Sequence, residues 1–252
     1  MKNLILQLAL FCFLPQLKAQ IVNIPDAAFK RELLTQGIDE NGDGEIQIDE
    51  AQKVTVLYVT KQQIKDLNGI DHFLNQEELG CYGNEIKYLD VSRLKKLQRL
   101  YAMENLLESI NITGLMCLKD IFLQNNPNLC LNIDFSQFQL LEELQVNNTR
   151  TPKLNLKNLK NLKIVEASNS MLNEIAIDGS LGLEQLWLGE NQLDTIDFRE
   201  LPKLKFIRLS NNPIKSVDIR QLKSLKQFSC LDCYALKQIN TSGCENLEPI
   251  LW

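Results

Sequence analysis

The sequence predicts an α/β solenoid: a curved stack of short repeats with a parallel concave β-sheet, preceded by a small helical cap. Three observations predict it. Apolar residues recur about every 21 residues over residues 54–252, an amphipathic segment lies upstream of them, and an Asp-rich loop joins the two parts. A unit of this length cannot bury its apolar face by itself, so neighbouring units must stack into one continuous core.

The composition is that of a folded, mildly acidic chain. Its 252 residues are 44% hydrophobic, and 27 Lys and Arg against 32 Asp and Glu give a net charge of −5. The apolar content excludes a disordered acidic chain. Nucleic-acid binding needs a dense positive surface that displaces phosphate counterions, so we expect no nucleic-acid partner.

Residues 1–19 have the layout of a secretory signal peptide. Lys2 provides a positive start, residues 4–14 form an apolar run, and the segment ends at the small residue Ala19. The run is too short to cross a bilayer as a helix, and no later stretch is longer. We therefore expect cleavage after Ala19 and secretion of the mature protein, which would be extracellular, at the cell surface or periplasmic. We do not expect it to span the membrane. The alternative is a buried first helix.

Residues 20–53 predict the helical cap. A short amphipathic helix is expected from Asp26 to Gln36, and Gly37 ends it. Residues 39–50 match the EF-hand loop, in which oxygen-bearing side chains surround a calcium ion and a glycine at position 6 permits the turn. The predicted calcium ligands are Asp39, Asn41, Asp43, Glu45 through its backbone carbonyl, Gln47, and Glu50 with two oxygens. Lone extracellular sites bind with Kd of ~0.1–1 mM, so we expect weak binding. The alternative is a metal-free polar turn that caps the repeats.

Residues 54–252 predict nine full repeats and the start of a tenth. Each unit places L-x-x-L-x-L on a short strand with its leucines pointing inward. One inward residue per unit marks the register: Leu57, Leu79, Leu100, Ile121, Leu144, Val165, Leu186, Ile207, Phe228 and Ile250. The tenth unit is incomplete and has no polar cap, which leaves open a truncated chain or an end covered by a partner.

A ladder of asparagines is expected to hydrogen-bond the backbone at the turn after each strand. Its members are Asn84, Asn105, Asn126, Asn191 and Asn212, and three units carry Thr149, Ser170 or Cys233 in the same position. The ladder is therefore predicted to be imperfect in those three units.

These units resemble the leucine-rich repeat family, and in particular the secreted bacterial internalin-type proteins. The phrases Leu89-Asp90-Val91-Ser92, Ile196-Asp197-Phe198 and Val217-Asp218-Ile219, with Cys81 and Cys230 on strands, carry the resemblance. It implies a helical cap with an EF-hand-like shape, which residues 21–53 supply. In that family the cap need not bind metal.

Six cysteines remain after the expected cleavage. Cys81 and Cys230 occupy the same inward position seven units apart, roughly 34 Å at ~4.8 Å per strand, which is too far for a disulfide. We expect most of the cysteines to be structural thiols, with Cys244 in place of a core leucine. A local disulfide among Cys117, Cys130, Cys230, Cys233 and Cys244 stays open, and redox or zinc chemistry at the Cys230-x-x-Cys233 motif is the least favoured alternative.

No catalytic constellation is recognisable. His72 is the single histidine, and the chain has no G-x-S-x-G or H-E-x-x-H motif and no Cys–His pair. We therefore expect a protein that is not an enzyme.

The predicted ligand-binding surface is the concave face, where residues alternating with the inward leucines are exposed. Its residues are Tyr58, Tyr82, Tyr101, Met103 and Phe122 near the N-terminal end, with Trp187 and Phe206 further along. Solvent-facing aromatic residues on a preformed sheet are typical of protein-binding hot spots, so we expect a protein partner. A glycan stacked on the rings is one alternative, and rings that merely cover strand backbone are another.

Overall fold

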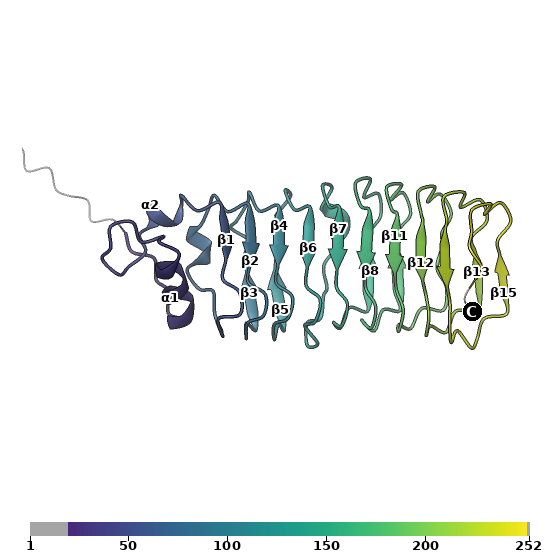
Figure 1. Ribbon diagram of the computed structural model, residues 1–252, viewed down its shortest axis with the longest axis horizontal. Coiled ribbons are helices and arrows are strands. Elements are labelled where there is room, and N and C mark those ends of the chain that lie inside the picture. Colours follow the sequence, from purple (N-terminus) through teal and green to yellow (C-terminus); the bar gives the residue numbers. More distant parts are fainter. Residues whose placement is uncertain (1–19, 251–252) are drawn as a thin grey trace, which may run out of the picture.

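The computed structural model describes residues 20–250, which form a single solenoid with the helical cap at one end and the last repeats at the other (Figure 1). The predicted signal peptide, residues 1–19, lies outside the described residues, as do residues 251 and 252. Within residues 20–250, no helix is long and apolar enough to cross a membrane.

The cap contains two helices, α1 (Ala27–Thr35) and α2 (Ile48–Ala51). Asp26 caps α1, as predicted: its Oδ1 accepts hydrogen bonds from the backbone N–H groups of Ala28 and Phe29, both at 2.9 Å. The other carboxylate oxygen accepts from the backbone N–H of Lys65 at 2.8 Å. One side chain thus starts the helix and ties the cap to the first repeat.

The Asp-rich loop also pairs with the chain that precedes α1. The N–H of Val22 donates to the carbonyl of Ile46 at 2.8 Å, and the N–H of Ile48 donates to the carbonyl of Gln20 at 2.9 Å. In paired EF-hands, the short segment that corresponds to the residues around Ile46 pairs with a second loop. Here residues 20–22 take that place, and the Ile46 side chain is buried.

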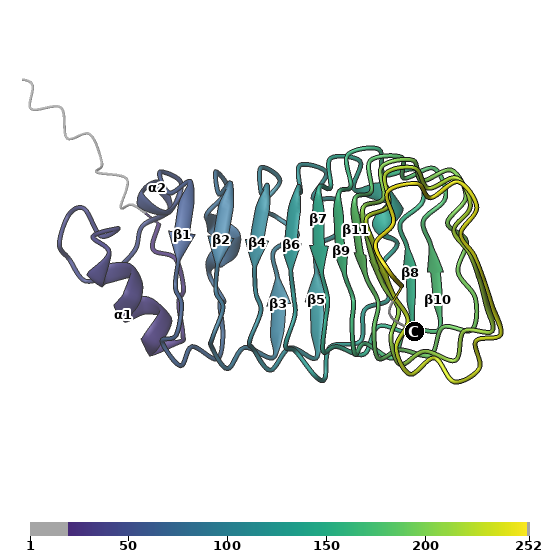
Figure 2. The same ribbon diagram turned by 45° about the vertical axis from the view of Figure 1, so that its right-hand side comes forward.

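Nine parallel strands form the concave sheet, one from each repeat. In spatial order they are β1 (Val56–Tyr58), β2 (Glu78–Gly80), β4 (Arg99–Tyr101), β6 (Asp120–Phe122), β7 (Glu143–Gln145), β9 (Ile164–Glu166), β11 (Gln185–Trp187), β12 (Phe206–Arg208) and β14 (Gln227–Ser229). The predicted anchors are in register along the whole sheet; Ile121 pairs with Leu144, for example, across the longest interval between anchors. Figure 2 shows the sheet curving along its length.

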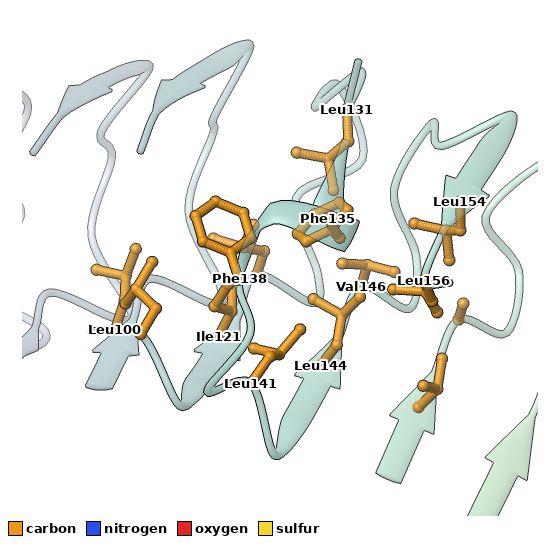
Figure 3. Packing of buried hydrophobic residues seen from close by; sticks show 14 of the residues in the cluster. Leu100, Ile121, Leu131, Phe135, Phe138, Leu141, Leu144, Val146, Leu154 and Leu156 are labelled. Atoms are coloured by element: carbon orange, nitrogen blue, oxygen red, sulfur yellow. The ribbon is translucent and has the colours of Figure 1, made fainter. Parts of the chain in front are cut away.

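Return segments cover the opposite, convex side. Three short parallel pairs lie there: β3 (Tyr88–Asp90) with β5 (Ser109–Asn111), β8 (Lys153–Asn155) with β10 (Glu174–Ala176), and β13 (Ser216–Asp218) with β15 (Gln238–Asn240). Two 3-10 turns, η1 (Ile70–His72) and η2 (Phe135–Gln137), lie in the return segments of other units. The core lies between the two sides. Figure 3 shows strand residues such as Leu144 meeting Phe138 and Leu141 of the return segment.

The asparagine ladder is present in the described units. Asn105 is representative: its amide donates to the carbonyls of Cys81 at 3.0 Å and Ala102 at 3.2 Å, and its Oδ1 accepts from the N–H of Ile86 at 3.1 Å. Thr149 and Ser170 keep part of this pattern, since both hydroxyls donate to the carbonyl of Val146 at 2.7 Å. The ladder therefore continues through those units with fewer hydrogen bonds.

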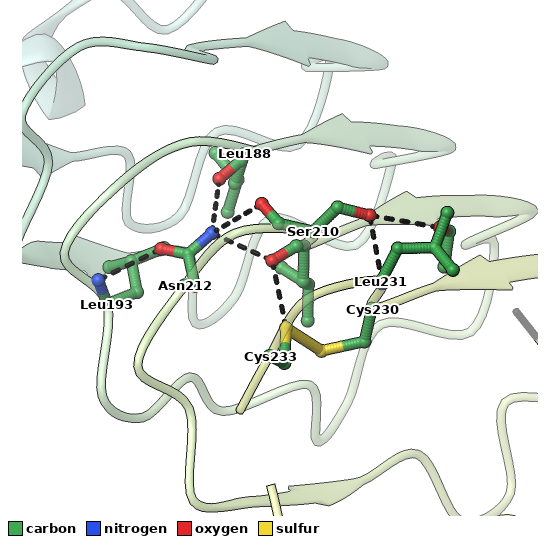
Figure 4. Close-up of a disulfide and its surroundings, with 9 residues drawn as sticks. Leu188, Leu193, Ser210, Asn212, Cys230, Leu231 and Cys233 are labelled. Carbon is green, nitrogen blue, oxygen red and sulfur yellow. Dashed lines mark hydrogen bonds between the residues drawn. A yellow bond between two sulfur atoms is a disulfide. The ribbon is translucent and has the colours of Figure 1, made fainter. Parts of the chain in front are cut away.

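Cys230 and Cys233 form a disulfide, so the expectation of separate structural thiols is wrong for this pair (Figure 4). The two residues lie on a strand end and its turn, with Cα atoms 5.7 Å apart, within the range that a disulfide spans. Cys81 is a buried free thiol, and Cys244 donates to the carbonyl of Ile219 at 2.9 Å. Burial raises the pKa of the Cys81 thiol to about 12, as for an inert core residue.

Candidate binding surface on the concave face

Three aromatic rings are stacked on the N-terminal half of the concave sheet. Tyr58 and Tyr101 have ring centroids 6.1 Å apart, and Tyr101 and Phe122 have centroids 5.1 Å apart, with their planes inclined by 25° and 14°. We call these three residues the ring stack. They occupy the last position of strands β1, β4 and β6, so the regular strand spacing brings residues 64 positions apart in the sequence to one surface.

Gly80 makes the ring stack possible, because β2 lies between β1 and β4. A Cβ at position 80 would lie 2.3 Å from the Tyr58 ring, a distance at which atoms overlap. The missing side chain lets the Tyr58 ring lie across β2 and reach Tyr101.

A polar network borders the stack. The guanidinium of Arg99 lies 2.6 Å from the Glu78 carboxylate and 3.4 Å from that of Asp120. The hydroxyl of Tyr58 donates to the other oxygen of Glu78. The hydrogen bond from Tyr58 lowers the pKa of Glu78, while burial and the same hydrogen bond raise the pKa of Tyr58. These bonds hold one ring of the stack in a fixed orientation.

The network predicts a pH-dependent contribution to stability. Ionised Glu78 has a lowered pKa in the folded state, so its contribution is present above the unfolded value of about 4.5 and is lost as pH falls through the folded pKa. Glu78→Gln is expected to lower the free energy of unfolding at pH 7 by at most ~1 kcal/mol, because Arg99 is 44% exposed and solvent screens the pair. Urea unfolding should show this difference shrinking at pH 3. A difference that is constant between pH 3 and pH 7 would contradict the role of the Glu78 charge.

The remaining predicted surface residues fall into two places. Tyr82 lies in the neighbouring column, where the ammonium of Lys61 is 6.0 Å from its ring centroid, and Met103 follows it one strand along. Trp187 and Phe206 lie on β11 and β12, separated from Phe122 by β7 and β9. At ~4.8 Å per strand, Trp187 is about 14 Å from the stack. The predicted surface is thus two patches on one sheet.

The predicted calcium loop is closed by its own hydrogen bonds. The carboxylate of Asp39 accepts from the N–H groups of Gly42 and Gly44, both at 2.8 Å, and that of Glu50 accepts from Glu40 and Gln47, both at 2.9 Å. Gly42 and Gly44 have φ of 74° and 82°, the left-handed conformation that glycine adopts without steric cost. The loop therefore has the turn that an EF-hand loop requires.

Side-chain amides link three of the predicted calcium ligands to one another. The amide of Gln47 donates to both carboxylate oxygens of Asp43, at 2.9 and 3.2 Å, and its oxygen accepts from the amide of Asn41 at 2.9 Å. The side chain of Glu45 forms a salt bridge with Lys30 of α1 at 2.7 Å, so only its backbone carbonyl is available to the loop. Within residues 20–250, no three His, Cys, Asp or Glu side chains gather as a metal site. Oxygens of Asn41 and Gln47 would have to complete a calcium shell.

Two parts of the surface were not identified from the sequence. Glu78 was not singled out, although it lies 21 residues before Arg99, and Asp120 lies 21 residues after it. Opposite charges spaced by one repeat length are placed side by side in a parallel sheet, and this signal is readable once the register is known. The contact between Arg208 and Trp187 carries the same signal, because these residues are also 21 positions apart and pair across β11 and β12.

Comparisons with known proteins agree with this geometry. Residues 181–221 match the family described as Leucine Rich repeats (2 copies). The solved internalin C2 from Listeria monocytogenes superposes with a TM-score of 0.66 at 20% identity, covering 82% of this chain and 95% of that structure. The chain folds as a leucine-rich repeat solenoid. The predicted fold, with its parallel concave sheet, is confirmed.

Two further similarities extend over different lengths of this leucine-rich repeat chain. The functional domain of InlJ from Listeria monocytogenes, which includes a cysteine ladder, gives a TM-score of 0.58 at 21% identity over 92% of this chain and 63% of that one. Toll-like receptor 2 type-2 from Gallus gallus is 28% identical over 165 residues, 61% of this chain. The chain spans 20% of that receptor. At these identities the solved structures establish the fold.

Proposed function

We propose that this leucine-rich repeat protein is a secreted, non-enzymatic recognition module that binds a protein partner through its concave face. The observation that carries the proposal is the ring stack of Tyr58, Tyr101 and Phe122, bordered by Arg99 and Glu78. Residues 1–19, with their signal-peptide layout, support secretion.

The geometry suits binding because the groups are held in place before a partner arrives. Strand backbone fixes each ring, and the stack and the Tyr58–Glu78 hydrogen bond restrict ring rotation. Little side-chain entropy is then lost on association, which raises affinity for a given contact area. Aromatic and Arg side chains at the centre of an interface are the residues that most often dominate binding energy.

The test is capture of extracellular proteins by residues 20–252, immobilised, with mass spectrometry as the readout. Tyr101→Ala combined with Phe122→Ala is expected to remove the captured protein, because each hot-spot truncation weakens binding roughly 30-fold. Tyr88→Ala is the matched control, since Tyr88 is a tyrosine 64% exposed on the convex strand β3. Equal capture by wild type and the double variant would contradict the proposal, and binding to a glycan array that depends on Tyr101 would favour a glycan ligand.

We further propose that the loop of residues 39–50 binds calcium weakly. Its side-chain oxygens, on Asp39, Asn41, Asp43, Gln47 and Glu50, are the hard donors that calcium prefers, and the two glycine turns give the loop its shape. Gln47 would have to turn its amide oxygen toward the ion in place of its NH₂ group. Because the loop already satisfies its own hydrogen bonds, the gain on binding is small, and an affinity of ~0.1–1 mM is expected.

Thermal unfolding in millimolar calcium and in chelator tests the loop. At ten times Kd, calcium is expected to stabilise the folded state by about 1.4 kcal/mol. Asp43→Asn is the informative variant because Asp43 is exposed and the change keeps an acceptor for the backbone. Glu50→Gln is a poorer choice: Glu50 is 4% exposed and accepts backbone hydrogen bonds, so its loss destabilises the cap with or without calcium. Identical wild-type curves in calcium and chelator would leave residues 39–50 as a metal-free cap.

A further inference from the structure

A separate cavity of about 440 Å³ lies on the C-terminal half of the concave face. Its walls include Trp187, Phe206, Arg208, Leu231 and Glu248, which come from four consecutive repeats. The volume lies within the range of ligand pockets in proteins. Two strands, β7 and β9, separate it from the ring stack, so the two places do not share residues.

Arg208 gives the cavity a positive charge that forms no salt bridge within residues 20–250. Its guanidinium carbon lies 5.2 Å from the Trp187 ring centroid, which orients it over the indole. Arg208 forms no salt bridge with any residue of the described chain, whereas Arg93, Arg99, Arg199 and Arg220 each pair with a carboxylate. The wall carboxylate, Glu248, accepts a hydrogen bond from Gln227 at 3.0 Å.

A second donor beside Arg208 has no partner in the described part of the chain. The indole N–H of Trp187 is buried and has no hydrogen-bond partner among residues 20–250. The planar guanidinium of Arg208 presents a fork that matches a carboxylate in geometry as well as in charge. Charge complementarity therefore favours an anionic group above Trp187.

Leu231 forms an apolar wall that the disulfide holds in place. Cys230 and Cys233 bracket it, and its backbone N–H donates to the hydroxyl of Ser210 at 3.1 Å (Figure 4). The side chain remains 44% exposed. The four preceding repeats carry small or polar residues at this position, namely Asn147, Ser168, Gly189 and Ser210, whereas Tyr82 and Met103 occupy it nearer the N-terminal end. Within the C-terminal half of the sheet, the apolar wall is thus particular to the repeat with the disulfide.

We propose that this cavity binds a peptide in which a large apolar side chain stands beside a carboxylate. The apolar side chain lies between Phe206 and Leu231, and the carboxylate pairs with Arg208. The cavity is a second contact on the concave face, and its occupancy does not require the ring stack.

Fluorescence of Trp187 provides a direct test. Trp187 and Trp252 are the two tryptophans of the chain, so Trp252→Phe leaves Trp187 as the single emitter. The probes are N-acetyl-leucyl-phenylalanine and its C-terminal amide, which differ only in the carboxylate. The free acid is expected to change the Trp187 emission saturably and to bind at least ~10-fold more tightly than the amide. Arg208→Gln should abolish this preference. No saturable change with either probe, or equal affinity for both, would overturn the proposal.

Two double variants test whether the cavity binds independently of the ring stack and whether the disulfide positions Leu231. Tyr101→Ala with Phe122→Ala should leave probe binding unchanged, so failure of the ring-stack proposal and failure of this one are distinguishable. Cys230→Ala with Cys233→Asn removes the disulfide and installs residues that other repeats carry at these positions, as in Ala167 and Asn212. This variant should fold, as shown by its thermal unfolding, and bind the acid probe several-fold more weakly. Unchanged affinity would overturn the role assigned to Leu231.

Discussion

Replacing Asn126 by Ala is expected to destabilise the protein by about 3–5 kcal/mol. Asn126 is fully buried, and its amide donates to the carbonyls of Ala102 at 3.0 Å and Leu123 at 2.9 Å. Its Oδ1 accepts from the N–H of Leu107 at 3.0 Å. Alanine leaves the Leu123 carbonyl and the Leu107 N–H without partners, and the Ala102 carbonyl keeps only the amide of Asn105. Each unpaired buried group costs about 1–3 kcal/mol. Urea unfolding monitored by circular dichroism measures the change.

Asn126→Thr is the matched control for this prediction. At the same position of the next repeat, the hydroxyl of Thr149 donates to the carbonyl of Val146 at 2.7 Å. A threonine at 126 should therefore restore one donor and recover about 1 kcal/mol of the loss. If Ala and Thr were equally destabilising, the ladder would act through side-chain volume and not through hydrogen bonds.

The repeat register and the ladder were predictable from the sequence because both depend on position within a fixed period. Once residues such as Leu100 and Leu186 are aligned, parallel pairing fixes which residues are neighbours, and the paired strands follow that alignment. The start of α1 was predictable for a similar reason, since an Asp before an amphipathic segment is a local capping signal.

The cavity and the disulfide could not be predicted in the same way. The sequence places Leu231 and Phe206 on one face, but whether their side chains leave a hollow depends on side-chain conformations that the period does not specify. The Cys230–Cys233 bond needs the turn to bring the two sulfur atoms together, a local geometry that a C-x-x-C spacing leaves open.

Ser180 shows a third limit of pattern reasoning. It takes the position of a core leucine, equivalent to Leu159 and Leu201 in the neighbouring repeats, and it is fully buried. Its hydroxyl donates to the carbonyl of Leu156 at 2.5 Å and accepts from the N–H of Leu159 at 3.0 Å. The hydrophobic pattern predicts an apolar residue here. The buried serine is tolerated because its hydroxyl is hydrogen-bonded both as donor and as acceptor.

Phe138→Ala is expected to have a comparably large effect, about 3–5 kcal/mol, through packing. Phe138 is fully buried, and its ring centroid lies 6.0 Å from that of Phe135 (Figure 3). The two rings lie on the return segment between β6 and β7, the fourth and fifth of the nine strands of the concave sheet. Truncation leaves a cavity in the middle of the solenoid, where the surrounding repeats are held on both sides and can collapse only partly.

The position of Phe138 makes this variant a test of how the repeats cooperate. Solenoid stability is approximately a sum of interfaces between neighbouring repeats, so a weak central interface should let the two halves unfold separately. Phe138→Ala is therefore expected to broaden the urea transition and lower its apparent m value as well as its midpoint. Phe138→Leu, which installs the residue of the neighbouring repeats at Leu115 and Leu159, should lose less than about 1.5 kcal/mol and keep a single transition. A wild-type m value in Phe138→Ala would mean that the solenoid unfolds as one unit despite its central defect, with coupling that extends beyond neighbouring repeats.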